Sequence, residues 1–350
     1  SYTLMSVADT LFVSRLGTDP LAAVGLAALL VFFTQSFGAG LMGGVRILVA
    51  QATGANQPNL AARFGWQGLW IALPLGACMA AMSFLPPSLF NLLGATNSVA
   101  ELADQFFNIR VLGAPLVLAN LAMSAWFQGC GDTKTPMKAA LFGNAVNIAL
   151  DPLLIFGMYG FPTLGIAGAA TATIIAMFVQ VMYLSFRIWP LIRHVEKHAD
   201  RGLFQPIWTT GSPIGVRYTL EMGSFVAFSS MITFVGPVEL AAHIIVVRIC
   251  SISFLPGHAV GEAAGVLVGQ FVGAGRHELA LPVIWSATKL AVGIMVSWGL
   301  IFWWFPEHLV RPFQAELAVS KVAVSILLVA AAFQLFDAVV MAVSGGLNGA

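Results

Sequence analysis

The chain has 350 residues and a net charge of +1, with 59% hydrophobic and only 9% charged residues. Ordinary soluble domains carry about 25% charged residues, so this composition excludes them and predicts a polytopic membrane protein. The small net charge provides no basic surface, and we expect no nucleic-acid partner.

Ten apolar runs reach the length of about 20 residues that a helix needs to cross a bilayer. In chain order they fall near residues 1–16, 21–47, 64–86, 107–128, 137–158, 164–189, 213–235, 240–272, 280–305 and 322–346. None shows the short alternating pattern of a membrane barrel, so the expected fold class is an all-α polytopic bundle. Glycines such as Gly40 and Gly44 in the second run favour close approach of helices.

Positive charges in the connections predict the orientation in the membrane. The connections after the even-numbered runs hold Arg63, Lys134, Lys138, Arg187, Arg193, Lys197, Arg201 and Arg276, whereas the others hold Arg15, Arg110, Arg311 and Lys321. Because cytoplasmic loops are richer in Lys and Arg, the even-numbered exits should lie in the cytoplasm. We therefore expect a multi-pass protein of the inner (plasma) membrane with cytoplasmic termini.

An internal repeat organises the chain. LVAQATGANQPNLA at 48–61 and LVGQFVGAGRHELA at 267–280 are identical at half of their positions, and at the same shift of 219 residues 16–26 align with 235–245. Two matches at one offset predict two parallel copies of one helical bundle. We expect an N-lobe at 1–190, a polar cytoplasmic linker at 191–211 and a C-lobe at 212–350.

The repeat also sets an expected helix count. At a shift of 219 residues, nothing in the second copy corresponds to the runs at 137–158 and 164–189. We therefore expect a fragment with about ten of twelve membrane helices, which lacks the start of the first helix and the last two.

Acidic residues inside apolar runs are the candidate functional residues, because such residues normally face a cavity or a partner. Asp9 and Asp151 both lie about 10 to 12 Å from the outer ends of their runs, with Asn147 one turn before Asp151. Two neighbouring acids could carry a proton. Alternatively, carboxylate, amide and hydroxyl oxygens could hold a sodium ion.

Four further residues are secondary candidates. Glu221 and Asp337 lie deeper, at about 21 to 23 Å from the outer face, and could form a second site in the C-lobe. His258 and Glu262 are one turn apart and either reach water at the cytoplasmic end or form a subsidiary proton path. The alternative for all buried acids is a polar contact that holds helices together.

Motifs of catalysis and of metal or nucleotide binding do not occur. The sequence has no G-x-S-x-G, H-E-x-x-H or P-loop, and its three cysteines fit neither a disulfide framework nor a metal site. We expect neither an enzyme nor an organic cofactor.

Several segments together resemble the multidrug and toxic compound extrusion (MATE) family. They are VADTLFVSRLG at 7–17, LVAQATGAN at 48–56, FQGCGDTKTP at 127–136, NIALDP at 147–152, GIAGAATAT at 165–173 and ELAAH at 239–243. The resemblance implies a twelve-helix antiporter of two six-helix lobes, which exports cationic or drug-like small molecules in exchange for protons or sodium. We expect a monomer surrounded by membrane lipid.

The resemblance also assigns residues. It places an N-lobe cation site at Asp9, Asn147, Asp151 and Thr173, and in some members a C-lobe site at positions that match Glu221 and Asp337. This chain departs from those members at Phe333, where they have a tyrosine. A phenyl ring has no oxygen to bind sodium, which favours protons or the N-lobe site.

Two other functions remain open at this stage. A flippase for lipids or lipid-linked sugars needs cationic residues for a diphosphate, and Arg248 is the one candidate. An integral-membrane enzyme or receptor needs clustered catalytic groups or a large domain outside the membrane, and the sequence predicts neither.

Overall fold

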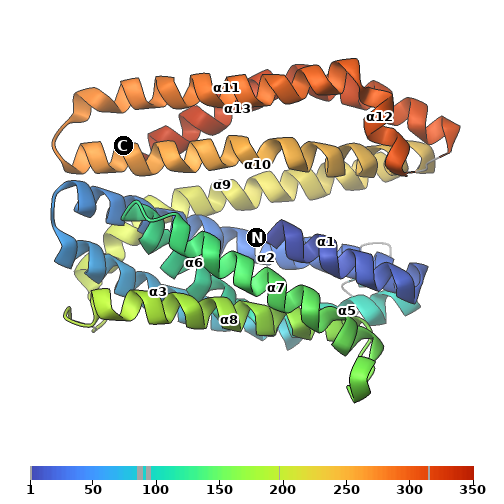
Figure 1. Cartoon of the computed structure of the whole chain (residues 1–350), viewed down its shortest axis with the longest axis horizontal. Coiled ribbons are helices and arrows are strands. Elements are labelled where there is room, and N and C mark those ends of the chain that lie inside the picture. Colours follow the sequence, from blue (N-terminus) through green and yellow to red (C-terminus); the bar gives the residue numbers. More distant parts are fainter. Residues whose placement is uncertain (1, 85–89, 92–95, 197, 314–315) are drawn as a thin grey trace. The chain divides into compact units, whose positions relative to one another are not determined.

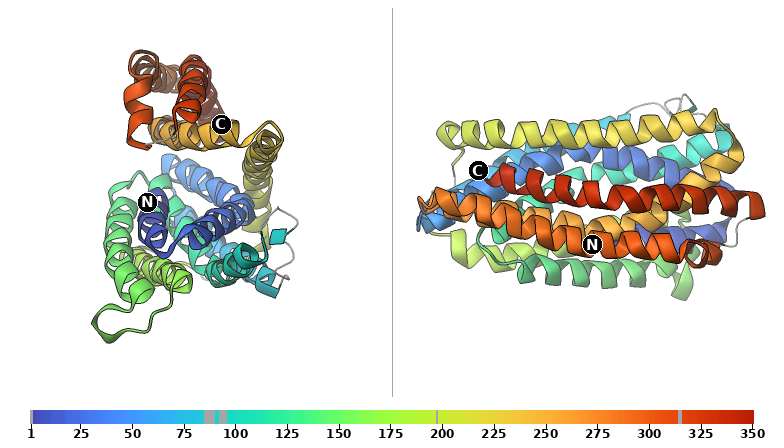
Figure 2. Two further views of the ribbon diagram at one scale, coloured as in Figure 1. Left: turned by 90° about the vertical axis from the view of Figure 1, so that its right-hand side faces the viewer. Right: turned by 90° about the horizontal axis from the view of Figure 1, so that it is seen from above.

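The computed structural model describes all residues except 1, 85–89, 92–95, 197 and 314–315. The described chain consists of α-helices and short 3-10 segments, without a β-strand (Figures 1 and 2). The all-α fold class is therefore confirmed. Lys197 and the predicted end of the third apolar run, at 85–86, lie outside the described residues.

The chain packs into two compact units. The first contains Ser1–Val49 and Pro58–Met222, and the second Ala50–Gln57 and Gly223–Ala350. Helices of the first unit are α1 (Tyr2–Val13), most of α2 (Thr18–Gly54), α3 (Pro58–Ala80), α5 (Asn97–Leu112), α6 (Ala114–Gly129), α7 (Lys134–Phe156), α8 (Ile166–Ile192) and the first part of α9 (Arg201–Thr233).

The second unit continues from the end of α9. Its helices are α10 (Pro237–Gly273), α11 (Ala280–Trp304), the short α12 (Pro306–Val310) and α13 (Leu317–Gly349). The 3-10 segments of the chain are Ser14–Leu16, Ala81–Phe84, Met158–Gly160, His277–Leu279 and Arg311–Phe313. In the core of this unit, buried apolar residues of α10 and α13 pack around Phe302 of α11.

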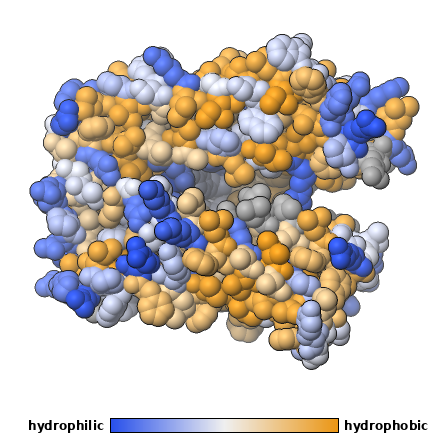
Figure 3. Space-filling model, viewed as in Figure 1, coloured by the Kyte–Doolittle hydropathy of each residue, from blue (hydrophilic) through white to orange (hydrophobic). Residues whose placement is uncertain are grey.

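Each predicted apolar run falls on a helix, but fewer helices pass as complete spans. Seven described helices are long and apolar enough to cross a membrane, and α5 with α6 brings the number to eight. Of the ten predicted spans, α1 has only 12 residues and α9 carries Arg217 and Glu221 in its middle. Large apolar side chains such as Phe178 and Trp285 are exposed on the helix flanks, as lipid-facing residues are. Hydrophobic residues cover much of the face seen in Figure 3.

The predicted fourth span is not a straight helix. The helix begins ten residues earlier than predicted, at Asn97, and bends by 47° between α5 and α6. Gly113 lies at the bend and Pro115 follows, and a proline has no amide hydrogen for the preceding turn. At the shift of 219, Ala332 and Gln334 occupy these positions, and α13 runs on without a break.

Glycines let α2 and α9 approach closely within the first unit, as the sequence predicts for Gly40 and Gly44. A Cβ atom at Gly40 would lie 2.5 Å from the Cα atom of Gly215, and one at Gly44 would lie 2.6 Å from that of Gly211. The Ser36 hydroxyl also donates a hydrogen bond of 3.2 Å to Thr219 Oγ1. Because small residues allow dense packing without a hydrophobic drive, this contact holds the two helices together.

The internal repeat is visible in the helix limits. α2 and α10 each have 37 residues, and both ends of α10 are displaced by 219 from those of α2. Within the second unit the two repeated segments make reciprocal contacts. A Cβ atom at Gly54 would overlap the Gln270 carbonyl, and one at Gly273 would overlap the Gln51 carbonyl.

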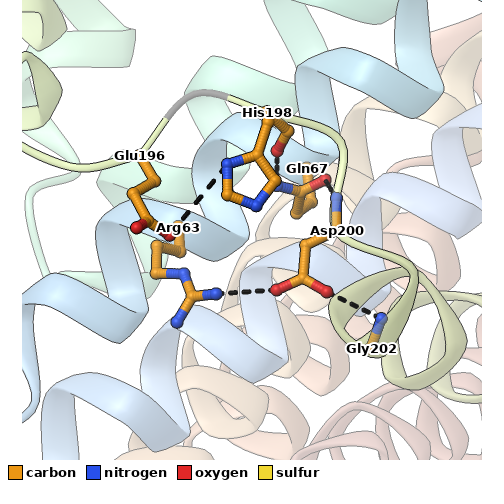
Figure 4. A network of polar contacts seen from close by, with 6 residues as sticks. All are labelled: Arg63, Gln67, Glu196, His198, Asp200 and Gly202. Atoms are coloured by element: carbon orange, nitrogen blue, oxygen red, sulfur yellow. Dashed lines mark hydrogen bonds and ion pairs between the residues drawn. The ribbon is translucent and has the colours of Figure 1, made fainter.

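The connection between α8 and α9 is shorter than the predicted linker 191–211. It extends only from Arg193 to Asp200, because α8 continues to Ile192 and α9 begins at Arg201. Asp200 forms a 2.6 Å ion pair with Arg63 of α3 and accepts a 2.8 Å hydrogen bond from the amide of Gly202 (Figure 4). Polar contacts therefore fix this connection to α3 and cap the start of α9.

Gln67 completes this polar network from inside α3. Its side chain is buried, donates to the carbonyl of His198 at 2.9 Å and accepts from the amide of Asp200 at 3.0 Å (Figure 4). Both halves of the buried amide are thereby satisfied, as buried polar groups require. The described part of the predicted linker is therefore tied to the first unit.

The glycine contact between α2 and α9 gives a test of stability. Gly44→Ala should destabilise the protein by about 1 to 3 kcal/mol, because the new methyl group forces two packed backbones apart. Gly25→Ala in the same helix is the matched control, since a Cβ atom there meets nothing within 4 Å. Thermal unfolding in detergent should show a lower midpoint for Gly44→Ala alone. Equal midpoints for the two variants would refute the packing argument.

Candidate functional site

The four N-lobe residues come together inside the first unit. Asp9 lies on α1, Asn147 and Asp151 on α7, and Thr173 on α8. Their exposed fractions are 5% for Asp9, 0% for Asn147 and Asp151, and 1% for Thr173. α1 packs against both α7 and α8, so three helices meet at this polar cluster.

Helical spacing and turn chemistry position the residues of α7. Asn147 and Asp151 are four residues apart and therefore share a face of the helix. The helix ends at Gly157, which adopts the left-handed conformation with φ 68° that glycine tolerates best. Near the same end, Gly168 of α8 lies against the Leu154 carbonyl, where any Cβ atom would overlap it. α7 and α8 are therefore packed closely beside the cluster.

Hydrogen bonds link the four side chains. The Asn147 amide donates to Asp9 Oδ1 at 3.2 Å and to Asp151 Oδ1 at 3.3 Å. The Thr173 hydroxyl lies 3.0 Å from Asp9 Oδ2 and also 3.0 Å from the Ala169 carbonyl. A hydroxyl has one hydrogen to donate, so the carboxylate and the carbonyl compete for it.

The two carboxyl groups share one hydrogen-bond donor. Asp9 Oδ1 and Asp151 Oδ1 lie 3.2 and 3.3 Å from the same nitrogen, Asn147 Nδ2. Two ionised carboxylates this close repel each other, and one proton on either of them removes the repulsion. The arrangement can therefore hold one proton.

Arg110 adds a positive charge to the cluster. Its side chain is 8% exposed, and its guanidinium interacts electrostatically with Asp9. The prediction that Arg110 is a loop charge is wrong, because α5 begins at Asn97 and carries Arg110 in its last turn. The signal was present, since the predicted span 107–128 already contained this position.

The donor set fits a small monovalent cation. Among the described residues, Asn147 Oδ1 and Asp151 Oδ2 are buried without a hydrogen-bond partner. With both acids ionised, Asp9, Asp151 and Arg110 sum to one negative charge, which a single proton or sodium ion neutralises. No group of three or more His, Cys, Asp or Glu residues in the described part of the chain could hold a metal ion. Sodium would instead bind to carboxylate, amide and hydroxyl oxygens.

The secondary candidates do not join this cluster. Glu221, on α9 of the first unit, is 59% exposed and forms an ion pair of 3.6 Å with Arg217 one turn before it. Asp337 lies on α13 of the second unit and is half-buried, one turn after the exposed Phe333. His258 is exposed and Glu262 half-buried on α10. A site in the C-lobe stays a prediction.

The start of α7 is held by Asp132 in the preceding turn. Asp132 Oδ1 accepts hydrogen bonds of 3.0 Å from the amides of Lys134 and Thr135, and Oδ2 accepts one of 2.5 Å from the Thr135 hydroxyl. Burial alone would raise the pKa of Asp132, but these hydrogen bonds outweigh it and hold the pKa below its usual 3.8. The FQGCGDTKTP segment therefore forms a helix cap, which fixes where α7 begins.

A sequence comparison decides the family. The sequence pattern of the MatE family matches this chain over residues 1–153 and 213–350. The chain belongs to the MatE family. The two matched segments include Asp9, Asn147 and Asp151, while Thr173 lies between them.

Relatives of this MatE protein cover most of its length. It is 31% identical to the probable multidrug resistance protein NorM of Burkholderia mallei, over 100% of this chain and 77% of that protein. It is 28% identical to the probable multidrug resistance protein NorM of Thermotoga maritima, over 99% of this chain and 76% of that protein. These matches extend through both units.

Solved structures share the fold. One is the outward-facing conformation of a multidrug resistance MATE family transporter of the MOP superfamily, with a TM-score of 0.87 and 24% identity over 99% of this chain and 78% of that chain. Another is a MOP superfamily transporter from Pyrococcus furiosus, with a TM-score of 0.85 and 23% identity over 99% of this chain and 80% of that chain. At this level of identity they show the architecture alone.

The helix cap at Asp132 gives a pH-dependent prediction. A carboxyl whose pKa is lowered by folding stabilises the fold above its unfolded value of 3.8, and this stabilisation is lost as the pH falls through the folded pKa. Asp132→Ala should therefore lower stability by about 1 kcal/mol at neutral pH, and by less below pH 3.8. Thr133→Ala is the control, because the Thr133 side chain makes no cap hydrogen bond. A difference between Asp132→Ala and wild type that does not change between pH 7 and pH 3 contradicts this account.

Proposed function

We propose that this MatE protein is a secondary active multidrug antiporter, which exports cationic or drug-like small molecules in exchange for protons or sodium. The single observation that carries the proposal is the buried cluster of Asp9, Asn147, Asp151 and Thr173. Ionisable groups at membrane depth are expensive and usually functional. The names of the NorM relatives, as multidrug resistance proteins, point to the same class of transport.

The cluster can couple an ion to a conformation. α1 contributes one carboxyl group, whereas α7 contributes the other carboxyl group and the bridging amide. A proton or sodium ion between the acids draws α1 to α7, and loss of the ion leaves two negative charges that repel each other. Export follows if the ion and the drug prefer different arrangements of these helices.

The net charge of the cluster supports one monovalent ion for each transport cycle. With Arg110 nearby, the cluster lacks one positive charge when both acids are ionised. The two carboxyl groups share a single amide donor, and this favours the proton, because protonation of one acid removes the repulsion between them. The unpartnered oxygens of Asn147 and Asp151 leave sodium as the competing ion.

The remaining assignments belong to the same proposal. We place the protein in the inner membrane as a monomer with cytoplasmic termini, with residues 1–190 and 212–350 as its two lobes. Arg110 is buried in α5 and therefore does not count among the charges of the outer connections. Without it, the predicted excess of Lys and Arg on the cytoplasmic side is larger. The proposal assigns no catalytic residue and no organic cofactor.

Replacement of either acid tests the proposal. Asp9→Asn and Asp151→Asn keep size and shape but remove the charge that binds the ion, so each should lower ion-driven export at least tenfold, or about 1.4 kcal/mol. The measurement is drug efflux from proteoliposomes driven by a sodium gradient and, separately, by a pH gradient. The gradient that drives the wild type identifies the ion.

Asp104→Asn is the matched control for these variants. Asp104 lies on α5 and accepts a 2.8 Å hydrogen bond from Asn108 in the same helix, outside the cluster. It should export at the rate of the wild type. Ion-driven export at the wild-type rate by Asp9→Asn or Asp151→Asn would overturn the proposal.

A further inference from the structure

A second set of buried polar groups lies about 10 Å from the carboxyl pair. On α7, Asn144 is seven residues before Asp151, and on α8, which runs in the opposite direction, Gln180 is seven residues after Thr173. At 1.5 Å per residue both therefore lie at one level, on the side where α7 begins and α8 ends. The Gln180 side chain reaches the backbone of α7 at Gly143, where a Cβ atom would collide with it.

Some polar atoms of these buried side chains have no hydrogen-bond partner among the described residues. Asn144 is 5% exposed and Gln180 2%. Asn144 Oδ1 and Gln180 Nε2 are buried without a hydrogen-bond partner among the described residues, as is Asn147 Oδ1 one turn above. A buried polar atom without a partner costs about 1 to 3 kcal/mol, so such atoms normally bind water or a ligand.

Further polar groups continue the row along α6. The Asn120 amide donates a 3.0 Å hydrogen bond to Gln180 Oε1, and the Ser124 hydroxyl lies 3.4 Å from Asn120 Oδ1. Asn120, Ser124 and Gln128 are spaced by four residues and share one face of α6. Gln128 lies one residue before the end of α6 and accepts a 3.3 Å hydrogen bond from Arg46 of α2.

We propose that Asn144, Gln180, Asn120, Ser124 and Gln128 form a hydrated track inside the first unit. The track binds water and carries the monovalent coupling cation, a proton or a sodium ion, between the carboxyl pair and the end of the bundle where α6 ends and α7 begins. Uncharged amides and hydroxyls suit this task, because they coordinate water or a cation without trapping it as a carboxylate does. The inference rests on the proposed antiport function and names the route that the ion takes.

The route is tested with side chains that exclude water. Asn144→Leu and Gln180→Leu should lower the maximal rate of drug efflux from proteoliposomes at least tenfold, in the gradient that drives the wild type. The drug concentration at half-maximal rate should stay within about twofold, because the carboxyl pair is intact and the track is proposed to carry the ion and not the drug. Asn144→Ser, which replaces the amide with a hydroxyl and leaves space for water, should restore at least a third of the rate. Leucine variants at the wild-type rate would overturn the track.

Gln334→Leu is the matched control. Gln334, on α13 of the second unit, is 1% exposed, donates to Ser253 at 2.8 Å and has an unpartnered Oε1, so it resembles Gln180 outside the track. It should keep the maximal rate. A tenfold loss in Gln334→Leu as well would show that burying leucine in place of any amide slows transport, and this also overturns the proposal.

One variant keeps the test independent of folding. Ser124→Ala removes a single hydroxyl of a half-buried residue, and it should slow efflux about threefold without changing the elution of the purified protein. An unchanged rate would count against the track even if both leucine variants fail to fold. Failure of the antiport proposal is distinguishable, because Asp9→Asn and Asp151→Asn would then still export on the ion gradient.

Discussion

A carboxylate inside an apolar bundle must find its partners on neighbouring helices, and this requirement organises the first unit. Asp9 reaches Asn147 on α7 and Thr173 on α8, and the amide of Asn147 also bonds Asp151. Water is absent from the lipid core, so these contacts replace hydration. The short α1 is therefore held to the bundle by the same polar groups that the proposed mechanism assigns to the ion. In that mechanism, ion binding and helix packing depend on the same contacts.

The duplication has left the two copies unequal. α2 and α10 keep the same length and the same 219-residue offset at both ends. At this offset Phe228 stands where the first copy has Asp9, and Val329 stands where it has Arg110. At these two positions the second copy therefore retains the scaffold but not the charges of the first.

Much of the fold could be predicted from the sequence because the signals are local. Apolar runs locate the helices, and the repeated LVAQATGAN and LVGQFVGAG segments align α2 with α10. The ends of the helices were less predictable. α2, for example, extends to Gly54 through small residues, which apolar periodicity does not distinguish from a loop. Asp9, Asn147, Asp151 and Thr173 were placed together by a family resemblance, and the geometry agrees with that grouping.

Tertiary contacts explain what the sequence could not provide. Arg110 lay inside a predicted apolar run, but only the structure shows that its side chain is buried and that the helix before it begins at Asn97. Gln180 and Asn120 are single amides in apolar runs, and only their mutual hydrogen bond distinguishes them from ordinary packing residues. Glu221 and Asp337 were paired by depth and by the family resemblance, and neither criterion contains information about which way a side chain points.

The interruption between α5 and α6 has a mechanical consequence. A continuous helix such as α13 moves as one rigid rod. A helix that is bent at Gly113 and Pro115 can change its bend angle, so that α5 moves while α6 keeps its packing. Arg110 lies on the last turn before this joint. A change in the bend angle would therefore move the Arg110 charge relative to the Asp9 carboxyl group.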